Sequence, residues 1–536
     1  MTFFPLNNDR SLFITLALTG GGLAAYYYFM RTVANPDSKQ RPLENIPVPK
    51  GGVPYFGHLF ALTSSPSSQI AKWQKELGLI MCVNMGVKPW IFLSDPDLAH
   101  DLFCKNGSAT SNRPFQTFTH HYHSKNRGIA FNNPSSQWNK TRAAVSQYIS
   151  SKTVSGLSHV LELEADALVQ RLLDTSAKDG QVDIVEPLQL AAMNGILTIG
   201  FGKRASSIND PLFQAVMGNL NEAIRHANMV RDMRVFLPAF SLFDYLFRPG
   251  MHGFVEKDTN PLYRRLIKEG LESNADCLVK RLSQLDYLDE KALIVTMNDV
   301  IAGGSDTVAI TAAWAMVILC RHQETQRAVR KEVDEFIAMH KRIPTFADRD
   351  QLPLLVSVQK ECMRYRVTSA FGRIVSMNLL VVAVIVAVLV FLIKHLRCHL
   401  LTVTCRGYFI PKGTTLVSNM RAIHMNPDVY DDPEKFIPDR FINRSKPMYA
   451  CANMNVQERD HFVFGWGRRT CPGVYMAEVE IYNILVRLLA KSIIAPPFSP
   501  DGKLIYPDLD KLDDVGVVIL PKDRILRIIA RSDTLI

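Results

Sequence analysis

The chain has 536 residues, of which 47% are hydrophobic and 21% charged, with 29 glycines and 29 prolines. These proportions are ordinary for a folded protein and exclude a collagen-like, low-complexity or broadly disordered chain. The nine cysteines are few, odd in number and never spaced as C-x-x-C. This pattern argues against a disulfide framework or a zinc module and favours a reducing compartment.

Basic residues outnumber acidic ones by 61 to 51, which gives a formal net charge of +10. Such a charge suits an acidic protein partner or an anionic membrane surface. Nucleic acid is the alternative, but the sequence has no dense basic block, recognition-helix signature or interleaved aromatic stripe. We therefore predict no nucleic-acid partner.

Residues 12–30 are uncharged and apolar, close to the length that crosses a bilayer, and three consecutive tyrosines lie near their far end. A cleaved signal peptide and a buried core helix are the alternatives, but the tyrosines suit a membrane interface and no small-residue cleavage site follows. More basic residues follow the stretch than precede it. By the positive-inside rule, we expect residues 1–31 to be a single-pass anchor that leaves the rest of the chain in the cytosol.

Prolines recur between residues 36 and 54, which predicts an extended linker over residues 32–59 because proline interrupts helices. Residues 60–536 show no repeat and no composition break, so we expect one large domain. Helical patterns dominate it, and the expected fold is mainly α with small β-sheets. Strand-like exceptions lie at 79–87, 91–94, 408–411 and 415–418.

A cysteine follows a glycine-rich, cationic loop in the string FGWGRRTCPG at residues 464–473. Arg468, Arg469 and the N-terminus of the helix expected next would lower the pKa of the Cys471 thiol. N–H groups near Gly473 would donate to its sulfur. A lone cysteine is ordinarily a small buried hydrophobe, but this setting predicts a thiolate that binds a soft metal, and a single thiolate on iron suggests heme.

The same string is similar to the F-x-x-G-x-R-x-C-x-G signature of the cytochrome P-450 family of heme-thiolate monooxygenases, which Phe464, Gly467, Arg469, Cys471 and Gly473 all fit. The resemblance implies that Cys471 ligates the iron of heme b, iron protoporphyrin IX. It also implies that Phe464, Arg469 and Gly473 belong to the cofactor site, with Arg469 at the anionic propionate edge.

The string AGGSDT at residues 302–307 falls inside a long helical pattern over 288–321. Two glycines remove side-chain bulk from one face of a helix, and this gap would admit dioxygen over a flat cofactor. Close helix packing beside an exposed aspartate is the alternative. The resemblance implies that Asp306 and Thr307 are catalytic and relay the protons that cleavage of the O–O bond requires.

Two further motifs precede and follow these strings. Glu361 and Arg364 have the spacing that puts both side chains on one face of a helix. The resemblance implies that they form a buried structural cluster with Arg440, and that Trp138 and Arg142 of a W-x-x-x-R pattern bind a heme propionate. The motifs occur in family order, and the resemblance covers residues 42–531.

The anchor and linker match the microsomal branch of the family, which implies a heme domain behind an N-terminal transmembrane helix in the endoplasmic reticulum membrane. The implied activity is insertion of one atom of dioxygen into a lipophilic small molecule with NADPH-derived electrons. The implied partners are an NADPH-dependent reductase, membrane lipid and, as a second candidate electron donor, cytochrome b5. A reductase-independent peroxide isomerase or dehydratase of the same fold is an alternative, which the intact Asp306–Thr307 pair argues against.

A second alternative is an inactive or heme-poor membrane protein, because residues 374–406 form an atypical apolar insertion with the polar-free run LLVVAVIVAVLVFLI at 379–393. A second membrane span there would put Cys471 and Glu361 on opposite sides of the bilayer, so we reject it. The segment is either a family-specific insertion on the membrane-facing surface or non-native sequence from a retained intron or wrong exon boundary. The abrupt return to family-like sequence at Gly407 favours the second. Arg373 is the nearest candidate for a further propionate partner.

The remaining motif is H-H-x-H, formed by His120, His121 and His123. It lies in an expected loop, where solvated histidines are favoured over a metal site.

Overall fold

The computed structural model describes residues 45–62, 66–227, 232–238, 251–369, 371–376, 403–515 and 518–533. The predicted anchor, the first part of the predicted linker and the apolar run at 379–393 lie outside the described residues.

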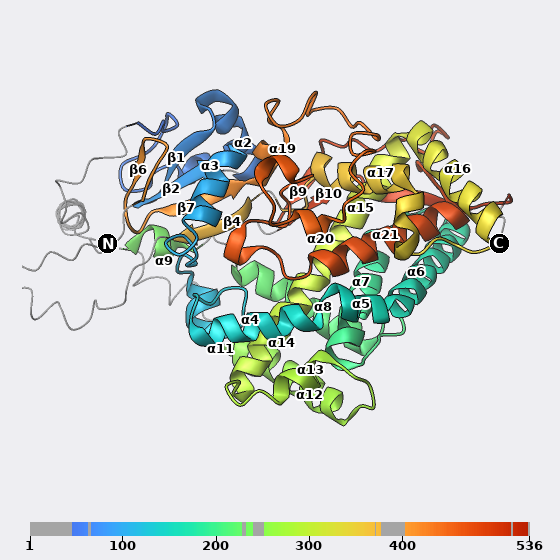
Figure 1. Cartoon of the computed structure of the whole chain (residues 1–536), viewed down its shortest axis with the longest axis horizontal. Coiled ribbons are helices and arrows are strands. Elements are labelled where there is room, and N and C mark those ends of the chain that lie inside the picture. Colours follow the sequence, from blue (N-terminus) through green and yellow to red (C-terminus); the bar gives the residue numbers. More distant parts are fainter. Residues whose placement is uncertain are drawn as a thin grey trace, which may run out of the picture.

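A bundle of helices forms the larger part of the molecule, with α15 (Asp306–Arg321) inside it (Figure 1). Every side chain of α15 from Val308 to Cys320 is buried, because apolar residues occupy all faces of this helix. The helices that pack around α15 are α7 (Val185–Phe201), α14 (Glu290–Gly304), α16 (Gln323–His340), α17 (Pro353–Tyr365) and α21 (Val474–Lys491).

Other helices complete the bundle and its edges. In α6 (Ser158–Asp179), Leu161, Ala165, Leu168 and Leu172 are buried at helical spacing, and the left-handed Gly180 follows its end. The remaining helices are α2 (Pro66–Leu77), α3 (Pro96–His100), α4 (Ser136–Tyr148), α5 (Ser151–Gly156), α8 (Pro211–Ala227), α9 (Met233–Phe236), α11 (Met251–Phe254), α12 (Asn260–Glu272), α13 (Leu278–Ser283), α19 (Met420–His424) and α20 (Met448–Cys451).

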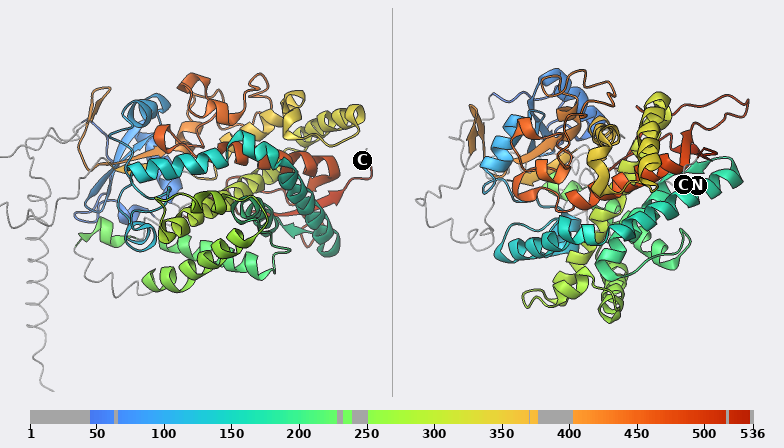
Figure 2. Two further views of the ribbon diagram at one scale, coloured as in Figure 1. Left: turned by 60° about the horizontal axis from the view of Figure 1, so that its bottom comes forward. Right: turned by 45° about the vertical axis from the view of Figure 1, so that its right-hand side comes forward.

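A four-stranded sheet lies at one end of the molecule, away from α6 and α16 (Figures 1 and 2). Its strand order is β1 (Ile80–Met85), β2 (Lys88–Leu93), β7 (Thr415–Asn419) and β4 (Phe371–Ser376). The β2–β7 pair is parallel and the other two pairs are antiparallel. The smaller sheets are β3 (Val182–Asp183) with β11 (Ile525–Ala530) and β8 (Ser492–Ala495), β9 (Leu512–Asp514) with β10 (Ile519–Pro521), and β5 (Val403–Cys405) with β6 (Tyr408–Ile410).

The structure confirms the prediction of a mainly helical protein with small sheets, and the four strand-like stretches correspond to β1, β2, β6 and β7. The single helical pattern over 288–321 is instead two helices that meet at Ser305. The two ends of the predicted insertion form strands, because β4 includes residues 374–376 and β5 is residues 403–405. Both strands pair with sequence outside the predicted insertion.

Within the described part of the chain, one stretch is long and apolar enough to cross a membrane, Glu290–Arg321, which is α14 together with α15. Its most apolar window is 78% buried inside the protein. We therefore interpret it as the central core helix of the bundle.

Candidate functional site

The predicted cysteine lies in a tight loop between the 3-10 turn Gly467–Arg469 and α21. The Cys471 N–H donates to the carbonyl oxygen of Phe464 over 2.8 Å, which closes the loop on itself. Gly467 has a φ of +48°, and a Cβ there would lie 2.6 Å from the carbonyl oxygen of Phe103. Only glycine fits this position, because any side chain would be both strained and in collision.

The Cys471 side chain is accessible, yet the protein atoms around it desolvate the thiol and raise its pKa. A backbone hydrogen bond from Gly473 and the charge of Arg142 act in the opposite direction without outweighing burial. The predicted lowering of this pKa by Arg468 and Arg469 is therefore wrong. A soft metal displaces the thiol proton on binding, so ligation does not require a low pKa in the free protein.

The Arg469 side chain binds loop backbone. Its three nitrogens donate to the carbonyl oxygens of Ser111 (2.9 Å), Ile129 (3.2 Å) and Asn132 (2.6 Å). This is the physical reason why its charge does not act on the sulfur as predicted. The guanidinium also stacks 4.4 Å from the ring of Trp138.

The structure brings both residues of the W-x-x-x-R pattern to the same place. Trp138 and Arg142 lie on α4, and the Arg142 guanidinium packs 5.5 Å from the Trp138 ring. Arg142 donates to the carbonyl oxygen of Thr470, next to the cysteine. The indole N–H of Trp138 donates to the carbonyl oxygen of Ile129 over 3.0 Å, so its predicted bond to a propionate stays a prediction.

Arg113 and Asp299 are two charged residues of this region that the sequence motifs did not predict. The Arg113 side chain donates to the carbonyl oxygen of Ala130 over 3.0 Å, and burial lowers its pKa to about 10, with the charge of Arg142 adding to the effect. Asp299 of α14 accepts the N–H groups of Ile129 (2.7 Å) and Ala130 (3.0 Å). No local pattern marks either residue, because both act on a loop distant in sequence.

The face of α14 and α15 that carries Ala302, Gly303 and Thr307 is exposed, although the rest of this helix pair is largely buried. A Cβ on Gly303 would meet nothing within 4 Å, whereas one on Gly304 would lie 2.8 Å from Ile196. One glycine therefore leaves open space and its neighbour permits close packing on α7. The predicted open face therefore applies to Gly303, and the alternative of close helix packing applies to Gly304.

The predicted catalytic pair points in two directions. Thr307 is exposed, and its hydroxyl donates to the carbonyl oxygen of Gly303 over 2.7 Å. Asp306 is buried, and its Oδ1 accepts the side-chain amide of Gln189 on α7 over 2.8 Å. Burial raises the pKa of this carboxyl above its usual range, so the alternative of an exposed aspartate is wrong.

The cysteine loop and the open helix face are joined by the segment 129–132. Arg469 holds this segment from the cysteine side, and Asp299 holds it from α14. Asp299, Gly303 and Thr307 follow one another at four-residue spacing and so share one face of the helix. The two sides of the candidate site are therefore tied together through one loop.

These features fit a heme. An accessible thiol would offer a ligand to the iron. A helix face without bulk leaves room for a flat ring and a small ligand. Burial lowers the pKa of Arg142. Negative charge nearby, of the kind that propionates carry, would stabilise its charged form.

The remaining residues of the cysteine signature frame this thiol. Phe464 is half-buried and supplies the carbonyl that accepts the Cys471 N–H. Gly473 precedes α21, and a Cβ there would lie 3.9 Å from the Cys471 sulfur.

Glu361, Arg364 and Arg440 come together as predicted from the resemblance. The Glu361 carboxylate binds Arg364 through two contacts of 2.7 Å and Arg440 through one of 3.0 Å, and the side chains of Glu361 and Arg364 are fully buried. Arg364 further donates to the carbonyl oxygens of His424, Pro433 and Lys435. The cluster thus holds the long segment before the cysteine loop onto α17.

The expected loop around the histidines is a helical turn, Thr117–Ser124. His123 is buried and stacks on Phe118, and desolvation lowers its pKa to about 4. His120 is half-buried, and desolvation also lowers its pKa to about 4. The prediction of solvated loop histidines is therefore wrong for these two residues. Among the described residues, no cluster of three His, Cys, Asp or Glu side chains is placed to hold a metal ion.

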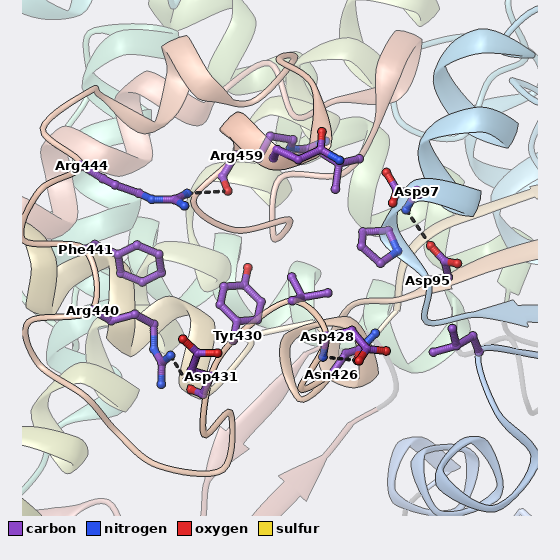
Figure 3. Close-up of a pocket in the computed structure, with 15 residues that line it drawn as sticks. Asp95, Asp97, Asn426, Asp428, Tyr430, Asp431, Arg440, Phe441, Arg444 and Arg459 are labelled. Atoms are coloured by element: carbon purple, nitrogen blue, oxygen red, sulfur yellow. Dashed lines mark hydrogen bonds between the residues drawn. The ribbon is translucent and has the colours of Figure 1, made fainter.

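A cavity of about 420 Å³ lies elsewhere, between the segment 426–444 and the start of α3 (Figure 3). Asp95 and Asp97 face Arg440 and Arg444 across it. It includes Arg440 but not Cys471, Asp306 or Thr307, so it is distinct from the candidate site.

Comparison with known proteins agrees with this geometry. The chain matches the cytochrome P-450 family model over residues 47–380 and 389–497 and therefore belongs to the cytochrome P-450 family. The break in the match falls inside the apolar run. Family membership implies a heme cofactor and makes the protein an oxidoreductase of the monooxygenase class.

Named relatives and a solved structure extend over most of the chain. Cytochrome P-450 monooxygenase verL of Clonostachys rogersoniana is 25% identical over 496 residues, which cover 88% of this chain and 84% of the relative. Cytochrome P-450 1A1 of Limanda limanda is 25% identical over 483 residues, with 85% and 86% covered. A zebra fish cytochrome P-450 structure with abiraterone has a TM-score of 0.67 at 22% identity and covers 87% of this chain and 100% of that one. The structural likeness supports the fold alone.

Proposed function

We propose that the protein is a membrane-anchored monooxygenase in which Cys471 ligates the iron of heme b and the substrate is a lipophilic small molecule. When bound, the heme supplies the redox chemistry that activates dioxygen. The observation that carries the proposal is the union of an accessible Cys471 with the open Gly303–Thr307 face, tied together through the loop at 129–132.

In this proposal the cysteine loop fixes the sulfur. The Phe464 carbonyl holds the Cys471 backbone, and the Gly473 N–H donates toward the sulfur. Such a donor stabilises negative charge on a thiolate ligand and tunes its donation to the metal. Arg142, with Arg113 and Arg469 behind it, offers positive charge to the propionates, while Trp138 packs between Arg142 and Arg469.

Asp306 and Thr307 handle protons from two sides of one helical turn. The raised pKa of Asp306 lets this buried carboxyl hold a proton closer to neutral pH, on the side of Gln189. Thr307 presents its hydroxyl on the open side. We assign to Thr307 the role of a proton donor on the open side and to Asp306 that of a proton-holding group behind it.

The proposal extends to the parts of the chain that surround the site. Residues 1–31 anchor the protein in the endoplasmic reticulum membrane, residues 32–59 are a linker, and residues 60–536 form one cytosolic domain. NADPH-derived electrons arrive through an acidic reductase, with cytochrome b5 as a second donor, and the net charge of +10 supports docking of acidic partners. Residues 374–406 are an atypical insertion, and sequencing the mature transcript tests whether they are retained.

The decisive experiment is a reduced carbon monoxide difference spectrum of membranes that express the full chain, with Cys471→Ala and, as control, the buried Cys451→Ala. We expect a thiolate-type heme band in the wild type and in Cys451→Ala and none in Cys471→Ala. A well-expressed wild type without this band would contradict the proposal and favour the inactive, heme-poor alternative.

A further inference from the structure

Lys360 is a lysine whose side chain is fully buried, at 0% exposure. Its Nζ lies 2.7 Å from Oδ2 of Asp460, which is 4% exposed. The ammonium also donates to the carbonyl oxygens of Arg444 and Lys446. Two of its three N–H groups therefore have carbonyl acceptors, and the contact with Asp460 is an ion pair, because Oδ2 accepts no hydrogen bond. Lysine is almost never fully buried without such compensation. We therefore infer that these contacts have a specific structural role.

Lys360 and its neighbour Glu361 hold two different stretches of chain. Glu361 binds Arg440 and the N–H of Ile437, and its partner Arg364 binds carbonyls between 424 and 435. Lys360 binds the carbonyls of 444 and 446 and the carboxylate of 460. Adjacent residues of a helix point about 100° apart, which explains how one turn of α17 serves both stretches.

Asp460 begins the stretch that carries the cysteine loop. Its carbonyl accepts the Tyr430 hydroxyl over 2.9 Å, and the N–H of Phe462 donates to His424 over 2.9 Å. Arg459 donates to the carbonyl of Gly465 over 2.8 Å and stacks 4.4 Å from Trp466. In Figure 3, Arg444 reaches the carbonyl of Arg459 beside Tyr430.

The last contact of this series reaches the cysteine itself, because the Cys471 N–H donates to the carbonyl of Phe464. Segment 459–465 therefore supports the backbone of Cys471, and Lys360 binds this segment near its start.

We propose that Lys360 and Asp460 are positioning residues that hold Cys471 in register for thiolate ligation of heme, separately from the Glu361 cluster. The inference rests on the proposed ligation by Cys471. Without Lys360, segment 459–465 loses its ion pair with α17 and shifts, and the Asp460 carboxylate keeps only the half-exposed Arg444, 3.6 Å from its Oδ1, as a counter-charge. The thiolate bond is then lost while the fold remains.

The test compares Lys360→Met with a matched control in the full-length, heme-loaded protein. Arg531 is the control because it is 2% exposed, binds the carboxylate of Asp334 and donates to the carbonyls of Leu489 and Ala490. Its contacts resemble those of Lys360, with Asp533 as a further carboxylate partner, and they lie at the C-terminal end of α21. The readouts are the unfolding midpoint and the fraction of heme with a thiolate-type band in the reduced carbon monoxide spectrum.

We expect Lys360→Met to lose at least half of the thiolate-type band at temperatures where it is folded, and Arg531→Met to keep this band at a similar loss of unfolding midpoint. The double variant Lys360→Met with Asp460→Leu removes both charges, so its midpoint should recover while its band does not. Where Lys360→Met fails to fold, Asp460→Asn serves as the milder variant with the same expected loss of band.

The inference is overturned when a folded Lys360→Met or Asp460→Asn keeps the full band, when Arg531→Met loses it equally, or when the double variant regains both band and midpoint. A wild type without any thiolate-type band contradicts the proposed function instead, so the two failures are distinguishable.

Discussion

The two sides of the candidate heme site are built in opposite ways. The cysteine side is loop backbone held by buried arginines and by glycines that no other residue replaces. The helix side is mainly apolar, and the polar contacts near its open face are those of Asp299, Asp306 and Thr307. We infer that the cysteine side fails when a charge is removed, whereas the helix side responds to volume and to the hydroxyl of Thr307.

The largest effect should come from the cysteine side, through Glu361→Gln. This change leaves Arg364 and Arg440 buried around a neutral amide, and removing one partner of a buried pair costs about 3–5 kcal/mol. Chemical unfolding of the full chain measures it. The control is Glu434→Gln, which breaks an exposed pair with Lys75. A loss of stability no larger than that of Glu434→Gln would show that the Glu361 cluster does not stabilise the cysteine side.

On the helix side, Thr307→Val should lower product formation by about two orders of magnitude, because a positioned proton donor contributes roughly 10²–10⁴-fold. Thr307→Ser keeps the hydroxyl and should retain most of the activity. Product formed per NADPH consumed is the measurement, and an unchanged heme spectrum shows that the site is intact. Equal activity in the Val and Ser variants would exclude a proton role for this side chain.

Alanine substitutions of the two neighbouring glycines test close packing and open space separately. Gly304→Ala should destabilise the protein by about 1–3 kcal/mol, because its Cβ would collide with Ile196. Gly303→Ala meets nothing within 4 Å and should stabilise the helix by about 0.5–1 kcal/mol. Unfolding midpoints of the heme-free proteins test the pair, and equal shifts would contradict the assignment of one open and one packed glycine.

Arg142→Met should release heme about tenfold faster, since a hydrogen bond to a charged group contributes roughly 1.5–3 kcal/mol. Transfer of heme to an acceptor protein measures the rate. Arg468→Met is the control because this exposed arginine donates to Asn139 at 3.4 Å. Identical rates in the two variants would mean that the propionates bind elsewhere.

The smallest effect concerns pH. Burial raises the pKa of Asp299 from 3.8 to about 6, so the folded state holds this proton more tightly than the unfolded state. Its stabilising contribution is complete below 3.8 and is lost as the pH rises through about 6. Asp299→Asn should therefore gain stability relative to the wild type as the pH rises through this window. A difference that does not change with pH would contradict the raised pKa.

Local patterns in the sequence were enough to predict a mainly helical fold, four strands and the cysteine loop, because periodicity and glycine placement act over a few residues. The contacts of Arg113, Asp299 and Lys360 could not be predicted, since their partners lie far away along the chain. The thiol pKa was mispredicted because desolvation, which raises it, comes from atoms that only the fold brings around Cys471. The sequence also places Arg469 beside Cys471, whereas in the fold its guanidinium binds the carbonyls of Ser111, Ile129 and Asn132.

The break at Ser305 changes the electrostatics of the residue after it. Because α15 is a separate helix of 16 residues, Asp306 occupies its first turn, where the aligned peptide dipoles place positive potential. This potential, reduced by the C-terminus of α14 at Gly304, favours the carboxylate and works against the burial that favours the neutral acid. A continuous helix would have placed Asp306 mid-helix, without that opposing influence. The interruption of the helix thus moderates the acid strength of the residue that follows it.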